Sequence, residues 1–181
     1  PKTWNKMHIH YGKPIYEGVF NRKIVSEIAK ILFEMEINFH VLVPENKDVS
    51  LKERVKRINE IVEKEGNDCY LLSIHGNAFN SKAYGYEVWT NKEVDEADEY
   101  AEIFFEEMKS MFPDRKMRSD KSDGDSDKES NFYIFKCNCP SLLTENFFFD
   151  NPVDARMMMS KEGVEKIAKA HVNAIIKINN L

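Results

Sequence analysis

The segment Cys-Tyr-Leu-Leu-Ser-Ile-His-Gly-Asn-Ala-Phe-Asn, residues 69–80, decides how the rest of this sequence is arranged. Its apolar run, Tyr70–Ile74, predicts a short buried β-strand. The run ends at His75-Gly76-Asn77, where an imidazole is followed by a residue that turns easily. Ligands of α/β proteins gather beyond the carboxyl ends of the strands, and imidazole is a common metal ligand. We therefore expect at His75 either a metal ligand or, more simply, a hydrogen-bonded core histidine.

The segments around this strand alternate between helical and strand-like patterns. Strand-like runs lie at residues 39–43, 70–74, 86–90, 132–136 and 142–147, and helical periodicity begins at Glu17, after Ser50, near residue 94 and after Ser160. The order strand, helix, strand over residues 39–74 predicts a βαβ unit with two parallel strands. We expect a single α/β domain with a mixed, mainly parallel sheet and helices on both faces.

Composition and charge narrow the class of protein. With 181 residues, of which 42% are hydrophobic, the chain can bury the core of one domain. A net charge of −5 argues against binding to duplex nucleic acid, which usually requires a basic surface. No apolar run reaches the roughly 20 residues of a membrane span. The three cysteines, an odd number, provide no disulfide framework, and the polar residues 113–130 predict a mobile surface loop.

One carboxylate stands inside an apolar strand. Glu145 lies within Leu142–Phe148, where an ionised side chain is costly unless it is paired or bound to a metal. Burial would raise its pKa towards neutral pH, as a general acid or base requires. The alternative is that Glu145 faces solvent on an edge strand or pairs with Lys136. His171, by contrast, lies in the apolar stripe of the last helix, and we interpret it as a packing residue.

Five motifs in order resemble those of the zinc-dependent N-acetylmuramoyl-L-alanine amidases of the family-three type. They are Glu17-Gly18-Val19-Phe20-Asn21, Ser50-Leu51-Lys52-Glu53-Arg54, Leu72-Ser73-Ile74-His75-Gly76-Asn77-Ala78, Gly85-Tyr86-Glu87-Val88 and Leu143-Thr144-Glu145-Asn146-Phe147-Phe148-Phe149-Asp150-Asn151. The resemblance extends from Glu17 to the C-terminus, and five ordered motifs are far more specific than one.

The resemblance implies a site and a reaction. Glu17 and His75 would be ligands of Zn²⁺, and Glu145 would be the catalytic carboxylate. Separately from the resemblance, we expect Asn77 to bind substrate, to orient the loop of His75 or to act simply as a turn residue. The bond cut would join N-acetylmuramic acid to L-alanine in peptidoglycan or a muropeptide. Such enzymes act outside the cytoplasm, so the resemblance implies a periplasmic or extracellular protein. Three protein ligands with one open position for water is also the general pattern of catalytic zinc.

The sequence departs from the family at the first zinc ligand. The family has a histidine followed by glycine after its first strand, whereas His8 and His10 are the only histidines before Glu17 and neither precedes a glycine. Either that motif and the first strand lie upstream of residue 1, or His10 has taken over the role. We favour the first explanation, so that residues 1–181 form an amidase catalytic domain without these parts. The alternative is a non-catalytic peptidoglycan-binding or degenerate amidase domain.

Overall fold

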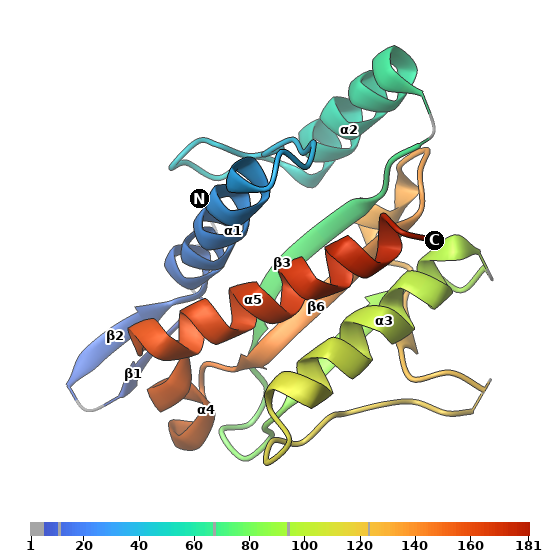
Figure 1. Ribbon diagram of the computed structural model, residues 1–181. Helices are drawn as coiled ribbons and strands as arrows, with labels where there is room; N and C mark the ends of the chain where they lie inside the picture. The colour runs from blue at the N-terminus through green and yellow to red at the C-terminus, as the bar shows by residue number, and fades with distance from the viewer. Residues whose placement is uncertain (1–5, 11, 67, 94, 123) are drawn as a thin grey trace.

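The computed structural model describes residues 6–10, 12–66, 68–93, 95–122 and 124–181 (Figure 1). Its elements are β1 (Met7–His10), β2 (Lys13–Tyr16), α1 (Glu17–Glu34), α2 (Leu51–Glu65), β3 (Leu71–Asn77), β4 (Tyr86–Thr90), α3 (Glu96–Met111), β5 (Lys128–Glu129), the 3₁₀ helix η2 (Tyr133–Lys136), β6 (Ser141–Phe148), α4 (Pro152–Met158) and α5 (Lys161–Ile178). None of the helices in these ranges is both long and apolar enough to cross a membrane.

The main sheet has four strands in the order β3-β6-β4-β5. The pairs β3–β6 and β4–β5 are parallel, and β4–β6 is antiparallel. This arrangement confirms the predicted α/β class with a mixed, mainly parallel sheet. Strands β1 and β2 form a separate antiparallel hairpin just before α1.

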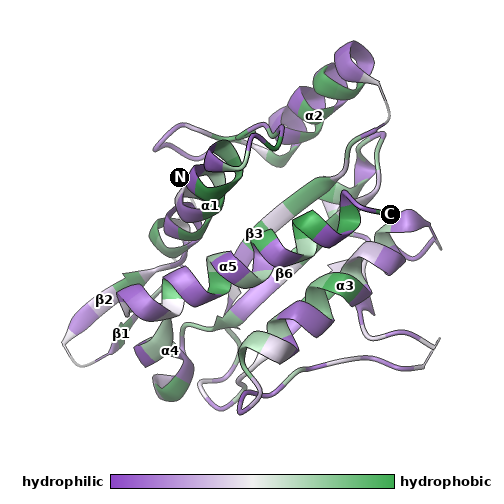
Figure 2. Ribbon diagram, viewed as in Figure 1, coloured by the Kyte–Doolittle hydropathy of each residue, from purple (hydrophilic) through white to green (hydrophobic). Residues whose placement is uncertain are grey.

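The two faces of the sheet pack against different helices. Leu142 and Val88 belong to the main hydrophobic cluster, which also contains buried residues of α1, α3 and α5. Leu143 lies on the opposite face, in a smaller cluster with Ile58 of α2 and Ile134 of η2. Helices therefore cover both faces, with α3 and α5 side by side over one of them (Figure 1). Figure 2 shows that β3 is hydrophobic where it begins and hydrophilic where it ends, beside the hydrophilic part of β6.

Local signals at the helix ends agree with the structure. Ser50 accepts a hydrogen bond from the Glu53 amide at 3.2 Å, and Ser160 accepts one from the Gly163 amide at 2.9 Å. Each such cap contributes about 1 kcal/mol because it satisfies a helix amide that has no backbone partner. The helix predicted from residue 94 begins at Glu96, and Val94 lies outside the described residues.

The strand predicted at residues 39–43 is wrong. This segment is irregular, with Phe39 and Val41 exposed by 37% and 39%, and it joins α1 to α2 along the surface. The Leu42 carbonyl accepts a hydrogen bond from Arg57 at 3.0 Å instead of pairing with a strand. The predicted βαβ unit is therefore absent, and β3 pairs with β6 from much later in the chain.

The strand predicted at residues 132–136 is also wrong, because this segment forms η2. The Phe135 amide bonds to the Phe132 carbonyl at 3.1 Å, which closes a 3₁₀ turn. The ring of Phe132 then contacts the rings of Phe135 and Trp89, at centroid distances of 5.6 Å and 5.5 Å. Phe132 and Phe135 are apolar residues whose rings pack in this cluster. In the sequence, these apolar residues resemble those of a buried strand.

His171 of α5 is a buried packing residue, as predicted. Its Nδ1 donates to the Ile167 carbonyl at 2.8 Å, so the neutral ring accepts at Nε2 from the Thr144 hydroxyl at 3.0 Å. Complete burial lowers the pKa of His171 to about 4, because the charged form would lose its hydration.

Acid should therefore destabilise the protein through His171. Below the ordinary pKa of histidine the unfolded chain binds a proton that folded His171 does not bind. The contribution of His171 to stability is therefore full above about pH 6.5 and falls as the pH drops towards 4. Between pH 7 and pH 5 this residue should remove about 2 kcal/mol from the free energy of unfolding. Urea denaturation of the wild type and of His171→Gln at both pH values measures this contribution as the difference between their pH dependences. The same pH dependence in both proteins would contradict the assignment.

Candidate active site

Strand pairing places three polar side chains in one row across the sheet. His75 of β3 is in register with Glu145 of β6, and Glu145 is in register with Glu87 of β4. Residues in register project to the same face. Thr144 contacts His171 of α5, so its neighbour Glu145 points to the other face, the one that also carries Leu143. His75 lies within β3 and not at its end as predicted, so the site lies on a sheet face.

Glu17 and His75 contact one another directly. Glu17 is the first residue of α1, where the helix dipole favours a negative charge, and only 4% of it is exposed. Its Oε1 lies 2.8 Å from Nδ1 of His75, and its Oε2 lies 3.0 Å from the Lys6 ammonium. Burial alone would raise the pKa of Glu17, but the hydrogen bond and charge of His75, aided by Lys6, outweigh burial and lower it. Glu17 is therefore a carboxylate at neutral pH.

The donor atoms of Glu17 and His75 are of the types that bind zinc. An imidazole nitrogen beside a buried carboxylate oxygen supplies two of the donors that catalytic zinc takes from proteins. Within the described residues, no His, Cys, Asp or Glu joins them in a group of three donors. His10 does not join them: its Nε2 lies 2.9 Å from the Phe149 carbonyl. The structure thus brings together two predicted ligands, and the third remains a prediction.

One of the two carboxylate oxygens of Glu145 has no hydrogen-bond partner among the described residues. This atom is Oε2, and it is buried. Burial raises the pKa of Glu145 to about 8, with a further contribution from the negative charge of Glu17. The edge-strand alternative is wrong because β6 lies between β3 and β4, and the ammonium of Lys136 lies instead over the Tyr133 ring. A carboxyl group of this pKa can both give and accept a proton near neutral pH.

Asn77 is fixed by two hydrogen bonds. Its Nδ2 donates to Glu87 at 3.0 Å, and its Oδ1 accepts from the Ala78 amide at 2.8 Å. Both polar atoms of the Asn77 side chain are therefore hydrogen-bonded within the protein. This favours the prediction that Asn77 orients the loop of His75. Its role in binding substrate remains a prediction.

Glu87 was not singled out from the sequence, although the structure makes it the centre of a network. It is 3% exposed and accepts hydrogen bonds from Arg118 at 2.6 Å and Lys128 at 2.9 Å, besides Asn77 and the Trp89 indole. The available signal was the one used for Glu145, a carboxylate inside an apolar strand. The two residues differ because Glu87 has cationic partners and Glu145 has none among the described residues.

Comparison with known proteins is consistent with this geometry. Residues 8–177 match the family Amidase_3, described as N-acetylmuramoyl-L-alanine amidase. The chain belongs to this amidase family. It is 30% identical over 173 residues to the N-acetylmuramoyl-L-alanine amidase CwlM of Bacillus licheniformis, covering 91% of this chain and 62% of that relative. The chain thus spans less than two thirds of that relative's length.

Solved structures of similar proteins share the fold. An N-acetylmuramoyl-L-alanine amidase from Clostridium difficile 630 superposes with a TM-score of 0.82 at 23% identity, covering 97% of this chain and 90% of that one. AmiC2 of Nostoc punctiforme gives 0.78 at 22% identity, covering 92% and 86%. At these identities the likeness concerns the amidase fold alone.

Replacing Glu145 by glutamine should make the metal-free protein more stable at alkaline pH. The folded protein holds a proton on Glu145 up to about pH 8, whereas the unfolded chain releases it near pH 4.5, so the contribution of Glu145 to stability falls as the pH rises between these values. Between pH 5 and pH 8 Glu145 should remove roughly 3 kcal/mol from the free energy of unfolding of the wild type, and this contribution should be absent in Glu145→Gln. Chemical denaturation at both pH values measures it, with the exposed Glu63→Gln as the control. A variant with the wild-type pH dependence would contradict the burial of this carboxyl group.

Proposed function

We propose that this amidase-family protein hydrolyses the amide bond between N-acetylmuramic acid and L-alanine in peptidoglycan, with the aid of zinc. The observation that carries the proposal is the row of Glu145 beside His75, with His75 bonded to Glu17. A carboxyl group able to exchange protons thus lies next to the two side chains suited to a metal. Peptidoglycan lies outside the cytoplasmic membrane, so we place the activity in the periplasm or the extracellular space.

The chain's own residues have separate roles in this proposal. Glu17 and His75 would hold the zinc ion, which when bound lowers the pKa of a water molecule to roughly 7 and polarises a carbonyl group. Glu145 accepts the proton of the attacking water and passes it to the nitrogen of the departing L-alanine. Ser73, whose hydroxyl lies 3.2 Å from Nε2 of His75, keeps the imidazole ring oriented.

The surrounding network keeps Glu145 in place. Asn146 donates from its side chain to the His75 carbonyl at 3.1 Å and to the Thr144 hydroxyl at 3.0 Å. Since Thr144 in turn contacts His171 at the core, the strand that carries Glu145 is fixed on both sides. Such rigidity favours catalysis because a general acid or base must be held close to the reacting atoms.

Turnover and zinc content should respond differently to two substitutions. Glu145→Ala should lower the rate of release of the stem peptide from a soluble muropeptide by a factor of 10² to 10⁴, the usual contribution of a general acid or base. Its zinc content should stay at the wild-type level, because Glu145 is not a proposed ligand. His75→Ala should lose both zinc and turnover. The measurements are chromatography of the released peptide and elemental analysis, with Glu63→Gln as the surface control.

Each result has a separate meaning. Full activity in Glu145→Ala would end the assignment of the general acid and base. If the wild-type protein takes up no zinc after loading and cleaves no muropeptide, it is a binding or degenerate member of the family. Cleavage of a sugar-free peptide at the same rate as a muropeptide would show that N-acetylmuramic acid is not recognised.

A further inference from the structure

The end of the polar loop at residues 113–130 is anchored to the sheet and to α3. Lys128 and Glu129 form β5, in register with Trp89 and Thr90 of β4. The backbone amide and the hydroxyl of Ser126 donate to the Glu102 carboxylate of α3, at 3.0 Å and 3.1 Å. The prediction of a mobile surface loop is therefore wrong for this part of it, and its anchored backbone can hold side chains in a fixed arrangement.

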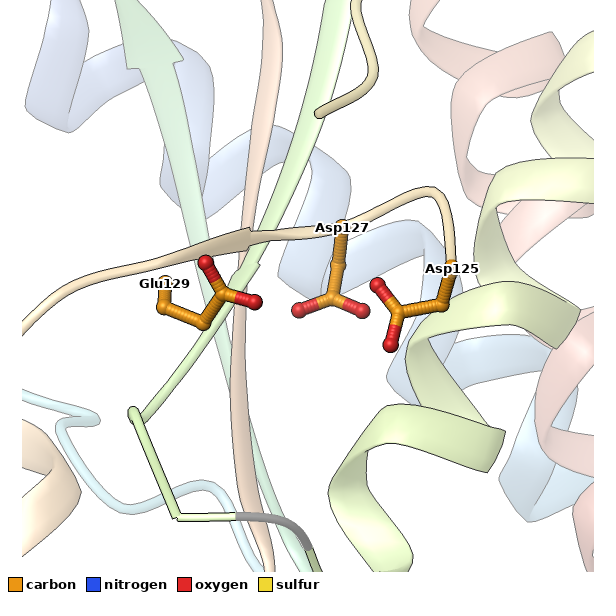
Figure 3. Close-up of side chains that lie close together, drawn as sticks. All are labelled: Asp125, Asp127 and Glu129. Carbon is orange, nitrogen blue, oxygen red and sulfur yellow. The ribbon is translucent and has the colours of Figure 1, made fainter. Parts of the chain in front are cut away.

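Acidic and basic side chains are separated at the end of this loop. In Asp125-Ser126-Asp127-Lys128-Glu129 every second residue is acidic. Residues 125–127 form a bend that leads into β5, where the successive side chains of Lys128 and Glu129 point to opposite faces. Figure 3 shows the three carboxylates gathered together, and one oxygen from each lies within 4.8 Å of the others. Lys128 points away from them, with its ammonium 2.9 Å from Glu87 and over the Trp89 ring.

Two carboxylate oxygens of this acidic cluster are buried and have no hydrogen-bond partner in the part of the chain that the structure describes. Asp127 is only 1% exposed; its Oδ2 accepts from the Thr90 hydroxyl, while its Oδ1 has no partner among the described residues. Oδ1 of Asp125 is also buried and also has no hydrogen-bond partner among the described residues. Burial, together with the neighbouring carboxyl groups of Asp125 and Asp98, raises the pKa of Asp127 to about 7, although the hydrogen bond from Thr90 acts to lower it. No ion pair is found for any of the three acids within the described ranges.

This arrangement is unfavourable for the protein alone. A buried carboxylate oxygen without a donor costs several kcal/mol, and neighbouring carboxylates repel one another. A divalent cation would remove both costs, since it satisfies the lone pairs and neutralises the charge. Three carboxylates with no nitrogen or sulfur donor favour a hard cation. Among such cations Ca²⁺ accepts irregular sets of six to eight oxygens, including water, whereas Mg²⁺ requires a near-ideal octahedron.

We propose that Asp125, Asp127 and Glu129 form a calcium site that holds the end of the 113–130 loop against β4. The site is separate from the Glu17–His75 pair, which contains a nitrogen donor and lies at β3, at the other edge of the sheet. Its occupation would stabilise the pairing of Glu129 with Thr90 and leave Lys128 bonded to Glu87.

Calorimetric titration of the full chain with CaCl₂ tests the proposal. His75→Ala, which lacks a proposed zinc ligand, should bind one Ca²⁺ per chain as tightly as the wild type does. At a free Ca²⁺ concentration 100 times Kd, Tm should rise by roughly 5–10 °C. Asp127→Asn and Glu129→Gln should each weaken binding at least about tenfold, since each removes a charged ligand. Asp120→Asn, which alters an exposed acid of the same loop, is the matched control and should bind like the wild type.

Three outcomes would overturn the proposal. One is the lack of stoichiometric binding up to about 10 mM Ca²⁺, beyond the range of even weak extracellular calcium sites. Another is equal weakening by Asp120→Asn and Asp127→Asn, which would indicate a diffuse effect of charge. The third is loss of calcium binding in His75→Ala. Circular dichroism of each variant verifies folding, and if Asp127→Asn is unfolded, the partly exposed Glu129→Gln decides the question.

Discussion

The pairing of β6 with two strands at once is the constraint on which the candidate site depends. β6 lies between β3 and β4, parallel to one and antiparallel to the other, and this places Glu145 between His75 and Glu87. The same strand turns Leu142 and Thr144 towards the main core and Leu143 towards α2 and η2. A shift of one residue in its register would exchange the two faces and move Glu145 into the hydrophobic core. The register of β6 with β3 and β4 thus determines both the packing of the core and the arrangement of the site.

Burial of carboxylates distinguishes the roles of the acidic residues. Glu17 has His75 and Lys6 as partners, and these partners lower its pKa although it is buried. Glu87 is also buried and is paired with Arg118 and Lys128. Glu145 lacks such a partner among the described residues, and its pKa rises. In the acidic cluster of Asp125, Asp127 and Glu129, two members, Asp125 and Asp127, likewise have a buried oxygen without a partner among the described residues. A buried carboxylate oxygen without a partner needs an explanation, such as proton transfer or a bound cation.

Another buried acid, Asp154, connects the ends of two strands. Asp154 of α4 is fully buried, and its Oδ2 accepts from the amides of Gly85 at 2.8 Å and Phe148 at 3.1 Å. It therefore joins the beginning of β4 to the end of β6. Gly85 has a φ of +109°, and a Cβ there would lie 2.3 Å from the Lys116 carbonyl oxygen, so no larger residue fits. This junction keeps the antiparallel pair aligned a few residues from Glu145.

The sequence by itself determined the features that depend on local chemistry. Helical periodicity and the caps at Ser50 and Ser160 located α2 and α5, and ordered motifs indicated the family before any geometry was known. Glu145 stood out because a charged residue in an apolar run needs a physical reason. These signals are confined to a few neighbouring residues, so the linear order contains them.

Only the tertiary structure decided which segments pair and which carboxylates gain partners. The alternation at residues 39–43 resembles a strand, but in the described part of the chain no strand pairs with it, and the surface segment bonds to Arg57 instead. Glu87 and Glu145 look alike in the sequence and differ because Arg118 and Lys128 reach only the first. The direct contact of Glu17 with His75 joins residues 58 positions apart. Pairing and desolvation depend on contacts between distant parts of the chain, and local residue patterns do not specify these contacts.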